Sequence, residues 1–558
     1  MNLQVRQRGG FFSDESAYYS ITQSIAYDLD LKYTKTDIYR IKKNYGTPQG
    51  IFLKKGRDGN LYFSKSFIYP LFAAPFFRIL GVNGFFIFHS ILLLILLIYG
   101  YLLLLKYYKS EISLGYILLF VFGSVAWIYF FWITADFFNF SMVFISYLIF
   151  FYYKDDDENI IPVILSAFIL GIVTFSKPPN VFLTLPLLYY IVFKKKSFKK
   201  FILYSAFYIL PAILLFTVQY SFTGDWNFMG GERKSFYYRF PLEQKDYTFD
   251  NLGIKMSSSD YWQRYYITPK IFFLNLIYFF IGRYTGILIY GLPALIFLIL
   301  FLFRRERNTL KYIIILTFFI EIFVYIGMAP DNYFGGAGSL GNRYGLNFLP
   351  LLFFLFPEKI DLKKMFYIAI GALLFLAPAF FEPIFYSAYT GELSKTPILG
   401  IFPPEITQIS SIPTNINPHA YRKPLVNSKI YILNNNFNGL KEDRGIWMYK
   451  EGMIEFVLET TKKCDNLKLY LKNNPMKEFN IVKIKIGSKK IKLRLSADES
   501  KNIVLSGIKP ALKLKNHYYY YGKISTTTSA IPFYITKDNR DRRRVSLYFK
   551  PVFEKCAE

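Results

Sequence analysis

The sequence predicts a polytopic membrane protein, an all-α helix bundle followed by a C-terminal antiparallel β domain. Of its 558 residues, 53% are hydrophobic and 20% aromatic, while only 19% are charged. A composition this apolar is typical of membrane proteins and not of soluble domains. Apolar stretches recur along the first 381 residues, and after residue 400 the pattern changes to short alternations of apolar and polar residues.

Ten apolar stretches are candidate membrane spans, because a helix that crosses the hydrocarbon core needs about 20 apolar residues. Some are shorter than this, so we expect about 10–11 spans, counting a first helix that is missing from the chain. The stretches are 84–105, 112–133, 137–153, 160–176, 179–193, 200–220, 285–303, 310–328, 344–357 and 363–381.

The connecting loops alternate in charge, which predicts their sides of the membrane. Basic loops such as "KKKSFKK" and "RRERNTLK" are expected in the cytoplasm. The intervening loops, among them "TAD" and "SKPP", then face outward, as do residues 1–83 and everything after 382. An exported N-terminal segment needs a signal or helix before it. We therefore expect that a preceding transmembrane helix is missing from this sequence.

The charge and cysteine content exclude several classes of protein. A formal net charge of +28 in a membrane protein indicates contact with anionic lipid. Nucleic acid is not an expected partner, because no binding motif is present and much of the charge lies in short loops. Two cysteines, Cys464 and Cys556, exclude a disulfide-rich scaffold. They can form one disulfide if their region is exported.

Residues 400–558 are predicted to form a separate exoplasmic β domain, and residues 1–399 the transmembrane domain. In "NIVKIKIGSKKIKLRLS" apolar and polar residues alternate around a turn at Gly487-Ser488, which is typical of a β-hairpin. Several such segments indicate a sandwich. Lys and Arg outnumber Asp and Glu here. This excess is either a solvated face or a surface for anionic lipid or glycan.

Ionisable residues gather in the segments predicted to face outward. Each has a structural interpretation: loop acids are solvated or cap helices, and arginines reach lipid headgroups. Ionisable groups at membrane depth are nevertheless costly and indicate function. We expect one pocket at the outer edge of the lipid. The candidates are Asp14, Glu15, Asp136, Lys177, Glu232, Arg233, Arg283, Arg343 and the neighbouring Tyr344.

This set of residues suits the transfer of a sugar from a polyprenyl phosphate. A sugar hydroxyl is a weak nucleophile and needs a carboxylate to accept its proton. The leaving phosphate needs Arg, Lys or a metal to stabilise its charge. Because the donor carries a long isoprenoid tail, the reaction belongs at the membrane surface.

Four motifs resemble a known family. "FFSDESAYYSITQSIAYDLDL" and "YFSKSFIYPLFAAPFFRILG" lie in the predicted first outer loop, 9–83, and "GRYTG" and "GNRYGLNFLPLL" enter late helices. The chain resembles, over roughly 9–381, the GT-C superfamily of integral-membrane glycosyltransferases, near bacterial relatives of protein mannosyltransferases and lipid A aminoarabinose transferases. The resemblance implies a many-helix bundle whose first outer loop carries interface helices, polyprenyl-phosphate donors and inversion at the anomeric carbon.

The resemblance also implies roles for individual residues. Asp14 matches the acid of the first outer loop and is the expected general base, with Glu15 as the alternate. Asp136 matches an acid of the second loop. Arg343 is the expected phosphate ligand.

The chemistry of the residues predicts further roles. Arg283 and Lys177 join Arg343 as candidate phosphate ligands. Substrate contacts are assigned to Glu232, Arg233 and Tyr344. Some family members use a divalent metal, and carboxylates such as Asp14 and Asp136 can ligate Mg²⁺ or Mn²⁺; the sequence does not decide this.

The leading hypothesis is a glycosyltransferase of the cell membrane, the inner or plasma membrane, that acts on its exoplasmic face. Its acceptor is a glycan, a lipid or a protein of the cell envelope. One alternative is a lipid or polysaccharide transporter, for which Glu321 inside a predicted span is the only mid-membrane candidate. Another is a non-catalytic membrane anchor for the β domain.

Overall fold

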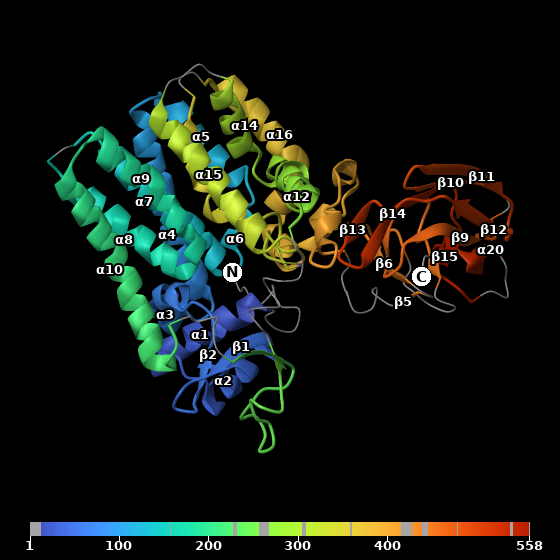
Figure 1. Ribbon diagram of the computed structural model, residues 1–558, viewed down its shortest axis with the longest axis horizontal. Helices are drawn as coiled ribbons and strands as arrows, with labels where there is room; N and C mark the ends of the chain where they lie inside the picture. The colour runs from blue at the N-terminus through green and yellow to red at the C-terminus, as the bar shows by residue number, and fades with distance from the viewer. Residues whose placement is uncertain are drawn as a thin grey trace.

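The computed structural model of the protein describes residues 13–156, 158–226, 232–255, 267–303, 308–336, 338–357, 360–414, 424–425, 428–437, 445–476, 478–535 and 540–556. It has three parts: a bundle of apolar helices, a small α/β unit at one end of the bundle, and a β domain beside that end (Figure 1). Residues 9–12 of the predicted first outer loop lie outside the described residues.

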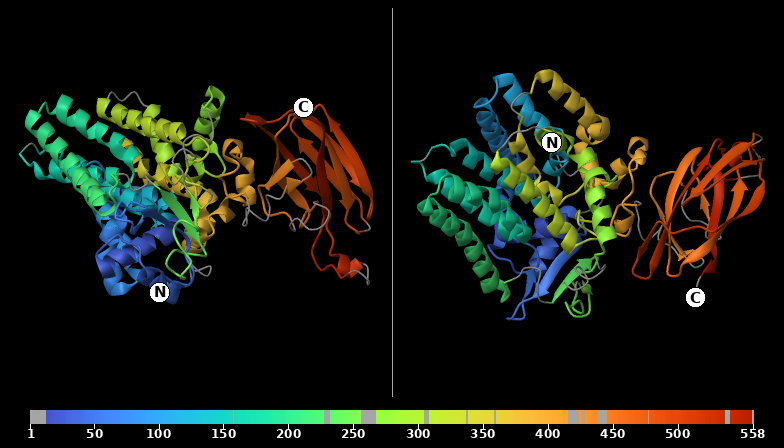
Figure 2. Two further views of the ribbon diagram at one scale, coloured as in Figure 1. Left: turned by 60° about the horizontal axis from the view of Figure 1, so that its bottom comes forward. Right: turned by 45° about the horizontal axis from the view of Figure 1, so that its top comes forward.

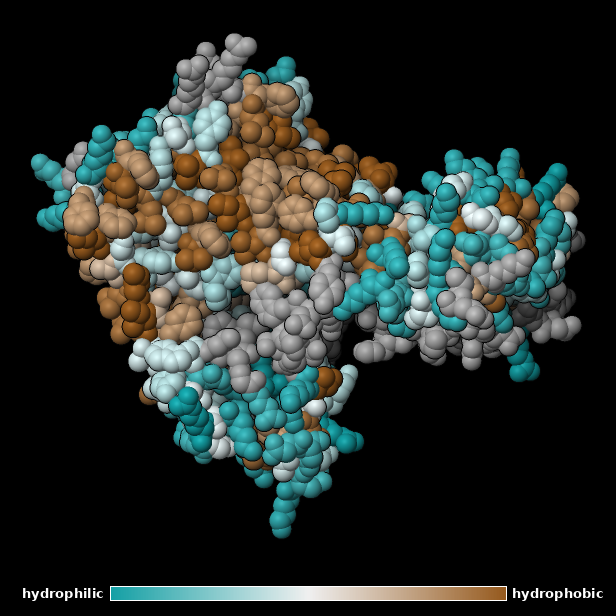
Figure 3. Space-filling view, viewed as in Figure 1, coloured by the Kyte–Doolittle hydropathy of each residue, from teal (hydrophilic) through white to brown (hydrophobic). Residues whose placement is uncertain are grey.

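Five helices are long and apolar enough to cross a membrane. Their outward faces carry large apolar side chains; on α10, for example, Ile213 is 56% exposed. The helical part therefore shows a broad apolar surface (Figure 3), as expected for a protein embedded in lipid. The five are α4 (Asn83–Leu105), α7 (Ala135–Tyr153), α10 (Phe198–Thr223), α15 (Thr309–Met328) and α16 (Leu362–Phe381).

Shorter elements complete the bundle, and several of them are fragments of single predicted spans. The span predicted at 112–133 is divided into α5 and α6 around Gly123, and the span at 344–357 consists of short 3-10 helices. The shorter elements are α3 (Ile68–Leu80), α5 (Ser110–Phe122), α6 (Ala126–Phe130), α8 (Ile161–Ser176), α9 (Leu185–Tyr189), α12 (Pro269–Ile281), α13 (Ile287–Tyr290), α14 (Leu292–Leu302), the 3-10 helices Pro178–Thr184, Gly345–Asn347 and Leu349–Leu355, and a π-helix, Tyr190–Lys194.

Helix α12 corrects the prediction that 221–284 is entirely an outer loop. It has 13 residues, fewer than the about 20 expected of a spanning helix, so a length criterion misses it. It packs on α15, where the rings of Phe272 and Phe323 lie 5.4 Å apart.

The small α/β unit joins two segments that are far apart in the sequence. It contains α1 (Asp14–Asp28), α2 (Lys35–Tyr45) and a four-stranded antiparallel sheet of order β2-β1-β3-β4. Strands β1 (Gln49–Lys55) and β2 (Leu61–Phe63) precede the bundle, whereas β3 (Arg233–Tyr237) and β4 (Ile254–Lys255) follow α10. Since β1 pairs directly with β3, these two predicted outer segments lie on the same side of the bundle, as Figure 2 also shows.

The loops predicted to be cytoplasmic meet at the opposite end. The Lys311 ammonium donates to the carbonyl of Phe356 at 3.3 Å, and the Tyr190 hydroxyl to that of Lys154 at 3.2 Å. Tyr108 also donates to the carbonyl of Pro357. The described loops thus separate into two groups at the two ends of the bundle, in the arrangement that the charge alternation predicts.

The C-terminal domain is a two-layered antiparallel sandwich, as the alternation predicts. One sheet has the order β11-β10-β14-β8-β6-β5 with β13 on β14, and the other β12-β9-β15-β7. Ile486 pairs with Lys489 across the predicted hairpin turn, where Gly487 has φ 57°, a conformation that favours glycine. The strands are β5 (Pro424–Leu425), β6 (Ser428–Ile432), β7 (Ile446–Trp447), β8 (Gly452–Thr460), β9 (Cys464–Asn473), β10 (Asn480–Ile486), β11 (Lys489–Leu495), β12 (Ser500–Ser506), β13 (Leu512–Leu514), β14 (His517–Thr526) and β15 (Leu547–Cys556), with one short helix, α20 (Pro532–Ile535).

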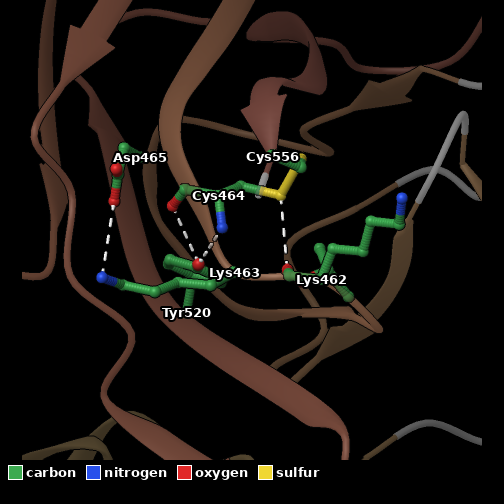
Figure 4. The surroundings of a disulfide bond; sticks show 7 residues. Lys462, Lys463, Cys464, Asp465, Tyr520 and Cys556 are labelled. Carbon is green, nitrogen blue, oxygen red and sulfur yellow. Dashed lines mark hydrogen bonds and ion pairs between the residues drawn. A yellow bond between two sulfur atoms is a disulfide. The ribbon is translucent and has the colours of Figure 1, made fainter. Parts of the chain in front are cut away.

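A disulfide joins the two cysteines of this domain. Cys464 at the start of β9 is bonded to Cys556 at the end of β15, and these two residues also face each other in the sheet. The hydroxyl of Tyr520 bridges to the second sheet: it accepts from the Cys464 amide and donates to the Cys464 carbonyl, both at 2.8 Å (Figure 4). The disulfide thus joins the two strands at one end of the sandwich.

A buried polar junction connects the β domain to the bundle. The segment between them contains α17 (Pro383–Ala388), α18 (Gly391–Ser394) and two 3-10 turns, Pro397–Ile401 and Ile406–Gln408. Glu405, which is fully buried, accepts bonds from the amides of Tyr284 and Thr285, each at 2.8 Å. Burial, partly offset by these bonds, raises the pKa of Glu405 to about 7.

Glu405 should make the stability of the protein depend on pH. The folded protein holds the Glu405 proton up to about pH 7, whereas the unfolded chain loses it near 4.5. The free energy of unfolding therefore falls as the pH rises through this window. Glu405→Gln keeps the acceptor oxygen and does not titrate, so above pH 7 it should be more stable than the wild type by an amount on the order of 3 kcal/mol.

The measurement is the melting temperature of the purified protein between pH 5 and 8 in one detergent. The matched control is Glu382→Gln, a change at an exposed glutamate of the same segment. Parallel melting curves for the wild type and Glu405→Gln across this range would contradict the prediction.

Candidate functional site

Charged side chains from five segments converge where the α/β unit meets the bundle. Asp14 is the first residue of α1, and Asp136 lies in the first turn of α7. Lys177 follows α8 directly, and Arg343 belongs to the loop between α15 and the next 3-10 helix. Lys65 lies between β2 and α3. These five residues are called the charge cluster below.

Arg343 connects the two acids of the charge cluster. Its Nη1 lies 2.8 Å from Oδ2 of Asp14, and its Nε lies 3.6 Å from Oδ2 of Asp136. Each acid also has a lysine of its own: Lys65 is 2.7 Å from Asp14, and Lys177 is 2.5 Å from Asp136. Three cations therefore surround two carboxylates, which leaves one net positive charge.

The charge cluster is largely shielded from water. The side chains of Asp136 and Arg343 are 4% and 11% exposed. Burial alone would raise the pKa of the Asp14 carboxyl, but the charges of Lys65 and Arg343 outweigh it and hold the pKa well below its usual range. Burial also lowers the pKa of Lys65, and the nearby charge of Asp14 only partly offsets this effect.

Tyrosines form one wall of the site. The ring of Tyr344 lies 5.1 Å from the Lys177 ammonium and 5.5 Å from the Arg343 guanidinium, and it stacks on Tyr325 at 5.0 Å. Tyr18, one turn after Asp14 on α1, is also buried. Burial and then the charges of Asp14 and Asp136 raise the pKa of its hydroxyl far above the usual value, so Tyr18 keeps its proton.

Local backbone features place these side chains. Both acids lie in the first turn of a helix, where the free amide groups favour negative charge. Gly335 has φ 103°, and a Cβ at this position would lie 2.7 Å from Nε of Arg343. Only glycine therefore lets the loop pass so close to the guanidinium.

The structure brings together five of the residues predicted from the sequence: Asp14, Asp136, Lys177, Arg343 and Tyr344. Lys65 was not among them, although it lies within the motif "YFSKSF". No periodicity or spacing marks this lysine as the partner of Asp14, because β1 and β2 lie between them in the sequence.

Arg283 lies elsewhere, and its predicted role as a phosphate ligand is corrected. The residue is only 1% exposed. Its Nη1 lies 2.6 Å from a carboxylate oxygen of Glu455 in the β domain. Its remaining nitrogens donate to the carbonyls of Gly400 and Phe402 at 3.2–3.3 Å. The side chain is therefore fully used in holding the β domain on the bundle.

The remaining predicted residues are Glu15, Glu232 and Arg233. Glu15 is half-buried beside Asp14, and successive helix positions do not face the same way. Glu232 is exposed. Arg233 on β3 is buried with its guanidinium 4.6 Å from the ring centre of Phe52, and its charge acts on Lys65.

The two acids considered as ligands of a divalent metal, Asp14 and Asp136, contact cations in this structure. A Mg²⁺ or Mn²⁺ site gathers anionic oxygen ligands. Here each carboxylate already contacts two cations, and the surplus charge is positive.

Comparisons of the chain with family models, with curated proteins and with solved structures give no match.

Replacement of Asp14 should destabilise the protein in a pH-dependent way. Asp14→Asn leaves Lys65 buried without its acid and Arg343 with Asp136 alone, which should cost about 3 kcal/mol. Because the folded pKa of Asp14 is lowered, its contribution is complete above the unfolded value of about 3.9. The contribution is lost as the pH falls below that value.

The measurement is the difference in melting temperature between the wild type and Asp14→Asn at pH 7 and near pH 2.5, where the difference should be smaller. Asp28→Asn, at the other end of α1, is the control. A difference that grows as the pH falls would show that the ion pairs of Asp14 do not contribute in the way described.

Proposed function

We propose that the protein is a glycosyltransferase that moves a sugar from a polyprenyl-phosphate donor to an acceptor of the cell envelope. The observation that carries the proposal is the charge cluster, a buried and net positive group of side chains with two carboxylates at one end of an apolar bundle. The family resemblance of the N-terminal motifs supports the same activity.

The surplus positive charge suits the phosphate of the donor. Arg343 offers a planar set of donors for phosphate oxygens, and Lys65 and Lys177 lie on either side of it, each bound to one of the acids that Arg343 contacts. When the phosphate binds Arg343 and Lys65, it replaces Asp14, the carboxylate that both contact. Asp14 then loses the charges that lower its pKa and becomes a stronger base.

The reaction needs one proton transfer and one displacement. The acceptor hydroxyl gives its proton to the Asp14 carboxylate while its oxygen forms a bond to the anomeric carbon. The bond from that carbon to the phosphate oxygen breaks, and the polyprenyl phosphate leaves with both bonding electrons. Arg343 and the lysines stabilise the charge that develops on it. Asp136 holds Lys177 and Arg343 in position.

The surface beside the site suits the isoprenoid tail. Helix α3, which follows Lys65 directly, exposes Leu71, Phe72 and Ile79. The site and this apolar surface belong to one short stretch of chain, so a donor with its tail in lipid can present its phosphate to the cluster.

We place the charge cluster and the β domain on the exoplasmic side of the cell membrane. The basic loops at the far end of the bundle favour the cytoplasm. The disulfide of the β domain is typical of an oxidising compartment.

The activity test uses the purified full chain in nanodiscs with a set of polyprenyl-phosphate-linked hexoses and measures the release of polyprenyl phosphate. Asp14→Asn should lower the rate by about 10²–10⁴ and Arg343→Gln by about 10²–10³. Asp28→Asn on the same helix should keep the wild-type rate. Full activity of Asp14→Asn would remove Asp14 from the reaction.

The same preparation in sealed vesicles separates transfer from transport. Appearance of intact donor on the far side, with no bond broken, would favour the transporter hypothesis instead.

The orientation is tested with reporter fusions after residue 558. An alkaline phosphatase fused there should be active, because that enzyme needs export and oxidation of its cysteines. A fluorescent protein that matures only in the cytoplasm should stay dark. The opposite pair of results would reverse the proposed orientation.

A further inference from the structure

One face of the large sheet of the β domain carries a compact group of cations. Strands β10 and β11 direct their apolar residues, such as Ile484, into the sandwich core. Their outward positions are basic and exposed except for Ile481, which is half-buried opposite Arg494. We call this surface the basic hairpin face: Lys483, Lys485, Lys490, Lys492 and Arg494.

The pairing of these residues is unfavourable without a partner. Lys483 lies directly opposite Lys492, and Lys485 directly opposite Lys490. Like charges that face each other across strands destabilise a sheet. Neither strand contains an acidic residue, and no ion pair of these cations occurs among the described residues. An anionic ligand would relieve the repulsion.

The same sheet face continues onto the bundle. Lys485 pairs with Lys523 of β14, which in turn pairs with Glu455 of β8, the partner of Arg283. Val457 and Tyr519, further along this face, are buried and pack into the core of the bundle. One half of the sheet face therefore rests on the membrane domain, and the basic hairpin face is its free extension.

This geometry directs the basic hairpin face toward the bilayer. A sheet face that rests on the bundle with one half presents its other half to the space beside the bundle, where lipid is expected. Figure 1 shows β10 and β11 at the side of the domain away from β5, and Figure 3 shows hydrophilic side chains there, beside the apolar surface of the bundle.

We propose that the basic hairpin face binds the headgroups of anionic phospholipids in the leaflet nearest to the β domain. Clustered lysines at a membrane surface are attracted to anionic lipid. An anionic glycan has the same charge, but it would approach from the aqueous side, away from the bundle. The lipid is therefore the better match to this face, which we expect to hold the β domain against the membrane.

The test measures how fast each lysine of the full chain is acetylated, by mass spectrometry. The protein is placed in nanodiscs of phosphatidylcholine alone or of phosphatidylcholine with phosphatidylglycerol. In the anionic discs the lysines of the basic hairpin face should react about fivefold more slowly, and high salt should abolish the difference. The internal controls are Lys472, Lys501 and Lys550, which lie on the other sheet.

A variant tests whether the face acts as a unit. In Lys485→Glu/Lys490→Glu, Lys483 should lose its protection from acetylation in anionic discs. In the matched variant Lys472→Glu/Lys550→Glu, Lys483 should remain protected. Both variants should retain the disulfide-linked sandwich, which is checked by their resistance to protease.

Two results would overturn the proposal. Equal acetylation rates in the two kinds of disc would show that the face does not contact lipid. Protection that appears only after a soluble polyglycerol phosphate is added to phosphatidylcholine discs would assign the face to an anionic glycan.

Discussion

The contact of Arg343 with two buried carboxylates is the interaction on which the rest of the arrangement depends. A buried charge is tolerated only when it is paired, and among the described residues Arg343 is the one cation that pairs with both Asp14 and Asp136. Asp14 belongs to the α/β unit, Asp136 to the start of a spanning helix, and Arg343 to a loop late in the bundle. Three regions that the chain separates by more than a hundred residues each are thus joined at one point.

Much of the fold could be predicted because its signals are local. The length of apolar stretches marks α4, α10 and α15, the charge of loops sorts the two ends of the bundle, and alternation marks the β10–β11 hairpin. The prediction of spans fails where an apolar stretch is short or interrupted. Helix α12 is too short for a length criterion, and proline or glycine divides other spans into fragments.

The site could be predicted by residue type but not by partner. Asp14, Asp136, Lys177 and Arg343 were expected together because all are ionisable and fall in loops of one side. Arg283 satisfied the same criterion, yet it pairs with Glu455 of the β domain, since only tertiary structure decides which acid an arginine meets. Lys65 is not predicted, because nothing in the sequence around it indicates that it pairs with Asp14.

The two arginines illustrate how one kind of side chain serves two purposes. Arg283 meets Glu455, which also contacts Lys523 and Tyr521, and the carbonyl oxygens of the linker take up its other donors. The donor nitrogens of Arg283 are therefore all bonded within the protein, and the side chain holds the β domain on the bundle. Arg343 instead shares two acids with two lysines, and the charges do not balance. A cluster with surplus positive charge can gain more from an incoming anion than it loses from its internal pairs, because the anion satisfies several cations at once. Imbalance, more than burial, therefore distinguishes Arg343, the proposed phosphate ligand, from the structural Arg283.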